Sequence, residues 1–212
     1  MLDKDKVNSF WNRRAEVNDP VVATHLKHDD AVEYDENLVR KYIKSNNVKV
    51  LDLGCGTGRT TNRIEKYVGS IRAVDKQQKF LDHCIKSKKV ELVCADVETY
   101  LDETKYDIIL LFGVMNYLSL EEANNVYKNC KKMLGDGGVL LVKHACGVKE
   151  NVYVDHYSEA IADNYCAEYR YVELEKNLLE NEGFNVEILD IYPDHLNPWS
   201  NTHFYAFICT SK

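Results

Sequence analysis

From Val48 onward, short apolar runs alternate with amphipathic patterns along the chain. The central runs are almost continuously hydrophobic, which is typical of parallel strands covered on both faces of a sheet. The pattern predicts five such strands, followed by two more near the C-terminal end: residues 48–53, 71–75, 90–97, 106–113 and 138–145, then 185–192 and 203–210.

Apolar positions at helical spacing lie between these runs and predict helices around residues 80–85, 120–134 and 171–182. The second helix opens with Ser119 and Glu122, which have the spacing of a capping box, and is expected to stop at Gly135. The third is expected to end at Gly183.

Alternation of strands and helices predicts an α/β fold with a doubly wound, mostly parallel sheet and helices on both faces. Only residues 193–202 separate the last two strands, and this segment is too short for a helical crossover. We therefore expect these strands to form an antiparallel pair at one sheet edge.

Composition narrows the class of protein. A chain of 212 residues with 45% hydrophobic and 29% charged residues is typical of one soluble domain. The formal net charge of -7 argues weakly against nucleic acid as the main partner. No apolar run approaches the ~20 residues of a membrane span, and the charged N-terminus lacks the apolar core of a signal peptide. These features favour a cytoplasmic location with no membrane partner.

The seven cysteines are odd in number and include no CxxC pair. Most lie inside apolar segments, which favours free buried thiols in a reducing compartment over a disulfide or zinc framework. No other group of residues has the spacing of metal ligands, so no metal site is predicted.

Residues 50–60, VLDLGCGTGRT, place three glycines directly after the first strand. Gly54, Gly56 and Gly58 allow a tight turn and a close approach of the main chain to a ligand. Their spacing is GxGxG, with Arg59 where the third glycine of a GxGxxG dinucleotide loop would fall. The loop thus favours a single nucleoside-like ligand over a pyrophosphate.

Acidic residues close the next two strands. Asp75 ends the second strand and can accept hydrogen bonds from both hydroxyls of a ribose. Asp96 ends the third, where it can accept from an adenine amino group while Val97 supplies an apolar contact. Either carboxylate alone would be read as a solvated strand end, but their combination with the glycine loop favours a binding site.

Taken together, these motifs resemble those of the class I S-adenosylmethionine-dependent methyltransferases. The resemblance rests on VLDLGCGTGR, AVD, CADV, YDIILLFGVMNYL, MLGDGGVLLV and LLENEGF, which follow one another between residues 45 and 210. It implies a Rossmann-like seven-stranded sheet whose last strand is antiparallel. It also implies an enzyme with S-adenosylmethionine as cofactor and S-adenosylhomocysteine as product.

The resemblance also implies an organisation and a cofactor site. One domain would comprise an N-terminal helical cap (1–44), a cofactor-binding core (45–146), a substrate-pocket insert (147–172), and a last helix with edge strands (173–212). Cofactor contacts are expected from the loop, the strand ends and the cap: Gly54, Cys55, Gly56, Gly58, Asp75, Lys76, Asp96, Val97, Phe112, Gly113, Trp11 and Arg14.

Because a sulfonium is already a good electrophile, the protein mainly has to hold a nucleophile in line with the methyl group at roughly 3–3.5 Å. A general base helps when that nucleophile is a hydroxyl. His144, with Lys143, is the candidate base at the end of the fifth strand, against an equal expectation of a structural histidine. Plain helix packing is an equal alternative for Trp11.

Further candidates for acceptor binding are Asn116, Tyr117, His25, His28, Tyr153, His156, Tyr157 and Arg170. Surface roles are the alternative for His25, His28 and Arg170, and simple packing is the alternative for the tyrosines.

We expect methyl transfer to an O or N atom of a polar small molecule. Such an acceptor could be a sugar, or a phosphorylated or nucleotide-linked precursor of surface polysaccharide. A protein or RNA methyltransferase and a noncatalytic subunit with the same fold stay open. The GxGxG spacing disfavours a nicotinamide dehydrogenase. A monomer or homodimer is expected.

Overall fold

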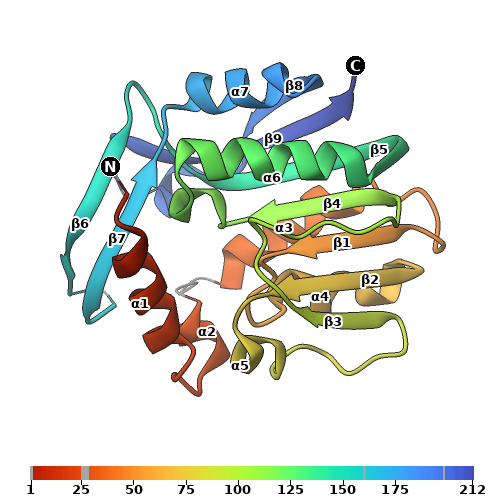
Figure 1. The fold of residues 1–212 in the computed structure, drawn as a ribbon, viewed down its shortest axis with the longest axis horizontal. Coiled ribbons are helices and arrows are strands. Elements are labelled where there is room, and N and C mark those ends of the chain that lie inside the picture. Colours follow the sequence, from red (N-terminus) through yellow and green to blue (C-terminus); the bar gives the residue numbers. More distant parts are fainter. Residues whose placement is uncertain (1, 25–28, 160, 198) are drawn as a thin grey trace.

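The computed structural model describes residues 2–24, 29–159, 161–197 and 199–212. Its centre is a seven-stranded sheet in the order β3-β2-β1-β4-β5-β9-β8 (Figure 1). Strand β9 runs antiparallel to both of its neighbours, and the pairs from β3 to β5 are parallel. The strands are β1 Lys49–Leu53, β2 Ser70–Asp75, β3 Val90–Cys94, β4 Tyr106–Phe112, β5 Leu134–Gly147, β8 Phe184–Asp190 and β9 Thr202–Ser211.

The predicted fold class is confirmed, including the antiparallel pair of β8 and β9 at one edge. The last strand lies inside the sheet between β5 and β8, and β8 forms the edge. Strand β3 stops at Cys94, three residues earlier than predicted, because Asp96 Oδ1 accepts a hydrogen bond from the Glu98 amide at 3.0 Å and the chain turns there.

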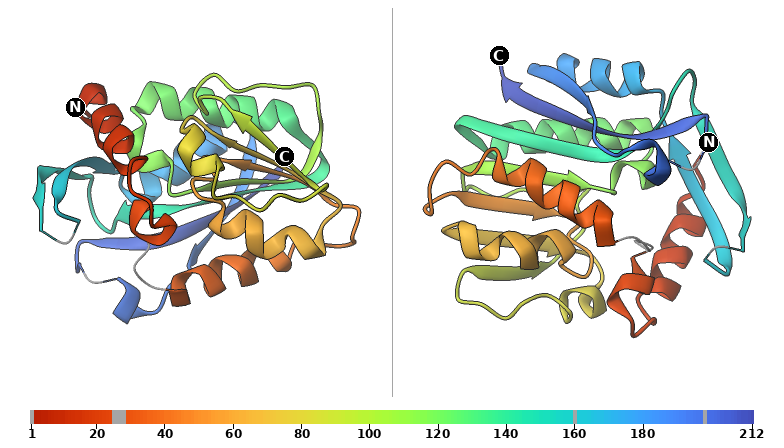
Figure 2. Two further views of the ribbon diagram at one scale, coloured as in Figure 1. Left: turned by 90° about the horizontal axis from the view of Figure 1, so that it is seen from below. Right: turned by 180° about the vertical axis from the view of Figure 1, so that it is seen from behind.

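Helices cover both faces of the sheet. Figure 1 shows α6 (Leu120–Met133) and α7 (Val172–Asn181) in front of it. The view from behind in Figure 2 shows α3 (Asp29–Arg40) and α4 (Arg59–Ile64) on the opposite face, and the 3-10 helix η1 (Glu65–Tyr67) follows α4 directly.

Each face has its own hydrophobic core, and alternate residues of one strand supply the two cores. In β1, Leu51 and Leu53 pack toward α6 and α7, whereas Val50 packs toward α3 and α4. In β5, Val142 faces the first core and Leu141 the second. This alternation follows from the two-residue period of a strand and decides where each polar side chain of β5 points.

The predicted helix signals agree well with the ends of α6 and α7. Ser119 and Glu122 form the capping box at the start of α6, which ends at Met133 as β5 begins at Leu134. Helix α5 (Gln78–Leu81) is shorter than the apolar stripe predicted. It stops because the Ile85 amide donates to Asn62 Oδ1 at 2.8 Å instead of continuing the helix.

The remaining elements gather beyond the carboxyl ends of the parallel strands, at the left of Figure 1. Strands β6 and β7 pair antiparallel as a hairpin, and helix α1 lies against it. Ion pairs join Lys6 to Asp155 at 2.6 Å and Arg13 to Asp163 at 2.7 Å. The predicted insert thus forms a β-hairpin. These elements are α1 Lys4–Arg14, α2 Pro20–Ala23, β6 Val152–Ser158, β7 Asp163–Tyr169, η2 Met115–Tyr117 and η3 Asp194–Leu196.

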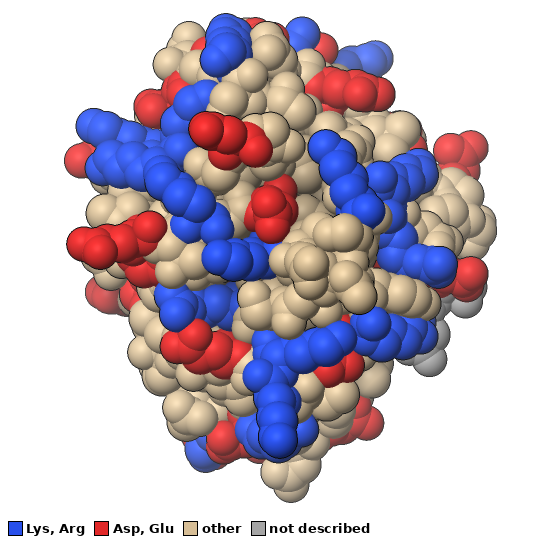
Figure 3. All heavy atoms as spheres, turned by 90° about the vertical axis from the view of Figure 1, so that its right-hand side faces the viewer, with Lys and Arg blue, Asp and Glu red and all other residues tan. Residues whose placement is uncertain are grey.

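The opposite end of the molecule, where the parallel strands begin, carries charges of both signs. Figure 3 shows Lys and Arg side chains interspersed with Asp and Glu over this face. In the described part of the chain, no helix combines the length and the apolarity needed to cross a membrane.

Candidate active site

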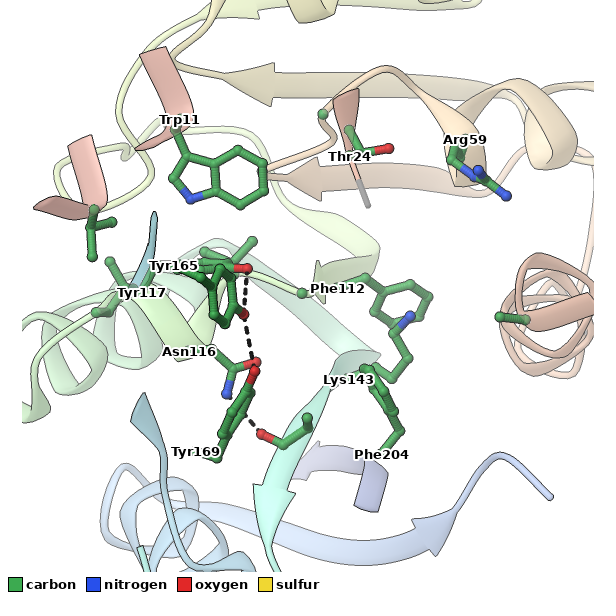
Figure 4. Close-up of a pocket in the computed structure, with 18 of the residues that line it drawn as sticks. Trp11, Thr24, Arg59, Phe112, Asn116, Tyr117, Lys143, Tyr165, Tyr169 and Phe204 are labelled. Carbon is green, nitrogen blue, oxygen red and sulfur yellow. Dashed lines mark hydrogen bonds between the residues drawn. The ribbon is translucent and has the colours of Figure 1, made fainter. Parts of the chain in front are cut away.

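A cavity of about 690 Å³ opens at the carboxyl ends of the parallel strands. One half is lined by the glycine loop after β1 and by the ends of β2, β3 and β4. The other half is lined by the hairpin, η2 and the segment around η3. Figure 4 shows Tyr117, Tyr165 and Tyr169 on this side. Helix α1 borders the cavity through Val7 and Trp11.

Main-chain hydrogen bonds hold the glycine loop in place. The Gly54 and Cys55 amides donate to Val74 O at 2.8 and 3.0 Å, and the Gly56 amide donates to Asp75 Oδ2 at 2.9 Å. Gly54 has a φ of 72°, and a Cβ there would collide with the Val114 side chain. The loop therefore requires glycine at this position and presents bare backbone to the cavity.

Two acidic residues line the same half. Asp75, only 9% exposed, also accepts from the Gln77 amide at 2.8 Å. Burial raises its pKa, although the two backbone hydrogen bonds oppose that shift. A carboxylate has about four acceptor sites, so Asp75 can still accept from two hydroxyls of a ligand. Asp96 and Val97 line the cavity beside it.

Three tyrosines form the far side of the cavity, here called the tyrosine wall: Tyr117 of η2 with Tyr165 and Tyr169 of β7. The Tyr169 hydroxyl donates to Tyr165 at 3.1 Å, and the hydroxyls of Tyr165 and Tyr117 are also 3.1 Å apart. Burial raises the pKa of each phenol. The wall therefore offers neutral hydroxyls and ring surfaces. Trp11 packs edge-on against Tyr117 with the ring centroids 5.0 Å apart.

Lys143 lies in a closed hydrogen-bond triangle. Its ammonium donates to Asp35 Oδ2 at 2.7 Å and to the Tyr192 hydroxyl at 2.8 Å, and that hydroxyl donates to Asp35 Oδ1 at 2.7 Å. Burial by itself lowers the pKa of Lys143, but the Asp35 charge reverses this and the net shift is upward. Lys143 is thus a protonated, paired cation that cannot act as a base.

Behind the tyrosine wall, Arg170 holds η2 in place. Its guanidinium donates to Leu118 O and Met115 O, both at 2.8 Å, and its Nε donates to Glu175 Oε2 at 2.5 Å. Arg170 is 1% exposed and Glu175 is fully buried. The pair fixes the turn that carries Asn116 and Tyr117.

Comparison with known proteins agrees with this geometry. Residues 50–138 match the family model described as "Methyltransferase domain". A SAM-dependent methyltransferase from Leishmania major has the same fold, with a TM-score of 0.76 at 18% sequence identity over 98% of this chain and 84% of that one. The family-model match over residues 50–138 and the shared fold both support a class I S-adenosylmethionine-dependent methyltransferase.

Curated relatives of this methyltransferase differ in what they do. The chain is 27% identical over 182 residues to the carboxy-S-adenosyl-L-methionine synthase of Shewanella halifaxensis (strain HAW-EB4), covering 81% of this chain and 74% of that protein. It is 30% identical over 127 residues to phosphoethanolamine N-methyltransferase 1 of Triticum aestivum, covering 52% of this chain but only 25% of that enzyme.

The residues of the cavity fit the cofactor of this family. Gly113 has a φ of 71°, and a Cβ built there meets nothing within 4 Å, so the backbone at the end of β4 faces open space. Together with the glycine loop and the free acceptor capacity of Asp75, this makes a cradle for a ribose and its substituents. Of the residues predicted to contact the cofactor, those that line the cavity are Trp11, Gly54, Cys55, Gly56, Asp75, Lys76, Asp96, Val97, Phe112 and Gly113.

The structure contradicts the prediction that His144 lies at the cavity. The side chain is fully buried and stacks on Phe207 with the ring centroids 5.7 Å apart. Its Nε2 lies 3.7 Å from Glu175 Oε2. Because Lys143 points toward α3, the next residue of the strand must point to the opposite face. His144 therefore cannot be the predicted base.

The structure also contradicts the predictions that Arg170 binds the acceptor and that Arg14 contacts the cofactor. Arg170 binds Glu175 and two carbonyls of η2 instead of the acceptor. The Arg14 guanidinium donates to the carbonyls of Ala23 and Val22, which ties α1 to α2, and it lies outside the described lining of the cavity.

Three more predicted contacts lie outside that described lining. Tyr153 and Tyr157 are 42% and 58% exposed on β6. Gly58 starts α4 with a φ of 77°, and a Cβ there would lie 2.7 Å from Cys84 Sγ, so its role is packing. Predicted acceptor residues that do line the cavity are Asn116, Tyr117 and His156.

His25 and His28 lie outside the described residues. Sequence reasoning did not select Tyr165, Tyr169, Asp35 or Tyr192, all of which line the cavity. Only the tyrosine-rich composition of residues 147–171 was a signal for the first two. All seven cysteines are free thiols, and the described residues contain no group of three or more His, Cys, Asp or Glu that could hold a metal ion.

Proposed function

We propose that this methyltransferase moves the methyl group of S-adenosylmethionine to a nitrogen or oxygen atom of a polar small molecule. The observation that carries the proposal is the continuity of the cavity. Its glycine-loop half suits the cofactor, and its other half, between the tyrosine wall and the Lys143 triangle, suits an acceptor.

The size of the cavity favours a small acceptor. Its volume of about 690 Å³ is typical of small-molecule sites, and the hairpin, η2 and the segment around η3 line its second half, whereas a protein or RNA acceptor would need a wide groove. Two curated relatives carry names that describe chemistry on small molecules, which supports the same class.

The structure also changes the expected character of the acceptor. A phosphorylated acceptor would need unpaired cations in the acceptor half, and Lys143 and Arg170 were the cationic side chains predicted there. Both cations are already paired, with Asp35 and Glu175 respectively. Neutral tyrosine hydroxyls and aromatic rings support an acceptor recognised through hydroxyl or amine groups instead.

This chain's own residues would orient the two reactants and exclude water. Asp75, Asp96 and the loop amides would hold the nucleoside part, and the tyrosine wall would position the acceptor. The cofactor supplies an activated methyl group, so the protein mainly contributes alignment.

Calorimetric titration with S-adenosylmethionine, S-adenosylhomocysteine and NAD tests the first part. We expect binding of the first two only, and an affinity loss of roughly tenfold or more in Asp75→Asn, because charge-assisted hydrogen bonds to the ribose are lost. Asp136→Asn, at an exposed position near the start of β5, is the matched control. Binding of NAD, or an unchanged affinity in Asp75→Asn, would contradict the site assignment.

Transfer of labelled methyl groups to a panel of small amines, sugars and sugar phosphates tests the acceptor class. Turnover of an RNA or protein substrate with none of the small molecules would overturn this part of the proposal.

A further inference from the structure

The carboxamide of Asn116 is locked in one orientation. Its Nδ2 donates to Ala145 O at 2.7 Å and to Glu168 O at 3.1 Å. Both partners are main-chain carbonyl oxygens, which cannot donate, so only the nitrogen of the amide can face them. The Oδ1 atom must therefore point away from these carbonyls.

That oxygen is available to a ligand. Asn116 is 5% exposed and lines the cavity beside the tyrosine wall (Figure 4). Within the described part of the chain, its Oδ1 accepts no hydrogen bond, whereas both protons of its Nδ2 are used. An amide oxygen has two lone pairs and no proton, so it offers a site for a hydrogen-bond donor alone.

Asn116 also lies at the boundary between the two halves of the cavity. Val114, two residues earlier, packs over Gly54 of the glycine loop, and Tyr117, the next residue, begins the tyrosine wall. A group held by Asn116 is thus placed beside the cofactor half and inside the acceptor half.

The position is rigid. The carbonyls of Met115 and Leu118, on either side of Asn116, both accept from Arg170, and Glu175 fixes the guanidinium from α7. The Asn116 side chain joins η2 to β5 and β7 at the same time. Such support removes the entropy cost of aligning a catalytic contact.

We propose that Asn116 Oδ1 accepts a hydrogen bond from the reacting atom of the methyl acceptor, and that Arg170 is a positioning residue for this contact. This inference rests on the proposed function. It deepens that function because the reacting atom must then carry a hydrogen: a primary or secondary amine, or a hydroxyl. A carboxylate, a phosphate dianion or a tertiary amine would bring lone pairs against the lone pairs of Oδ1.

The lone pair of the acceptor nitrogen or oxygen forms the new bond to the methyl carbon, while the carbon–sulfur bond breaks and its electron pair stays on sulfur. The hydrogen held by Asn116 Oδ1 keeps the nucleophile's lone pair directed at the methyl group. It leaves as a proton to solvent water when the methylated product is released, because a neutral amide cannot keep it.

Sinefungin provides a test that needs no known acceptor. This analogue has a carbon in place of the sulfonium sulfur, and that carbon carries an amine in place of the methyl group, so it brings N–H donors to the position of the transferred group. The readout is the ratio of the dissociation constants of S-adenosylhomocysteine and sinefungin, measured by calorimetry. A purely structural defect weakens both ligands and cancels in this ratio.

We expect wild-type protein to bind sinefungin more tightly than S-adenosylhomocysteine. In Asn116→Leu the ratio of the two dissociation constants should fall by roughly tenfold or more, because that is the usual effect of losing a hydrogen bond to a charged group. Asn116→Asp places an oxygen against the Ala145 and Glu168 carbonyls, so it should weaken both ligands, but its other oxygen still accepts and the ratio should be kept. Arg170→Lys should lower it by a smaller factor. Tyr157→Phe, exposed on β6, is the control and should match wild type.

An unchanged ratio in Asn116→Leu, or a reduced ratio in Asn116→Asp, would overturn the inference while leaving the proposed function intact. Failure of wild-type protein to bind either ligand would instead remove the proposed function. If Asn116→Leu fails to fold, the Asn116→Asp ratio decides. Methylation of any acceptor at an atom without hydrogen would also overturn the inference.

Discussion

Replacing Arg170 by methionine leaves the Glu175 carboxylate buried without its cation. Neither side chain reaches solvent, and the closest contact between them is 2.5 Å. Removing one partner of a buried ion pair typically costs about 3–5 kcal/mol, and here Met115 O and Leu118 O lose a donor as well. This is a large fraction of the ~5–15 kcal/mol that stabilises a typical domain.

The double variant Arg170→Met/Glu175→Leu removes both charges, so its loss should be smaller than that of Arg170→Met alone. Urea unfolding followed by circular dichroism at pH 7 gives the free energies of unfolding of wild type, Arg170→Met and the double variant for this comparison. Thermal unfolding should show the same order, with a shift of roughly 2–4 °C for each kcal/mol in a chain of this size.

The pH dependence provides a second check. Burial opposes ionisation of Glu175, but the Arg170 charge and then His144 hold its pKa below the ordinary value. In wild type this stabilisation is complete above the unfolded pKa of about 4.3 and is lost as the pH falls toward the folded pKa. Without the cation, burial raises the pKa, so Arg170→Met loses stability as the pH rises above about 4.3.

The stability gap between wild type and Arg170→Met should therefore narrow as the pH falls from 7 to 4.5. The reasoning would be refuted by a loss of less than about 1 kcal/mol in Arg170→Met, or by a double variant less stable than the single one.

Two further predictions concern the cavity. Asp52 in β1 lines the cavity and accepts from the Thr61 hydroxyl at 2.6 Å, and burial raises its pKa to about 6. The contribution of Asp52 to stability should therefore fall by about 3 kcal/mol as the pH rises from about 4 to 6. In urea unfolding, wild type should lose that much more stability over this range than Asp52→Asn, and equal slopes would contradict the reasoning. Gly113→Val should weaken S-adenosylhomocysteine binding by roughly tenfold or more in calorimetry, because the new side chain would enter the cavity. Gly137→Val is the control: its φ of 70° is close to the 71° of Gly113, so it should cause similar backbone strain without the loss of binding.

Local signals in the sequence identified most of the fold. Continuous apolar runs marked the seven strands of the sheet, and the Ser119–Glu122 box and Gly183 marked helix ends, because each depends on neighbouring residues. The GxGxG loop with Asp75 was equally readable, since strand ends in such a sheet meet at one edge. These features were sufficient for the enzyme class and the cofactor half of the cavity.

The acceptor half depended on tertiary structure. Adjacent residues of one strand point to opposite faces of the sheet, so only one of Lys143 and His144 can face the cavity. The packing of β5 decides that it is Lys143. Lys143 is paired with Asp35, which lies 108 positions away in the sequence. The sequence alone therefore could not predict that the charge of Lys143 is already paired.

Asn116 shows the same limit most clearly. Its sequence position after the fourth strand suggested a contact, but the direction of its amide depends on carbonyls of β5 and β7 and on a buried Arg170–Glu175 pair. Local sequence determined which elements form and where the glycine loop lies. Packing between distant segments decided which side chains reach the cavity and which of their atoms are left free to bind.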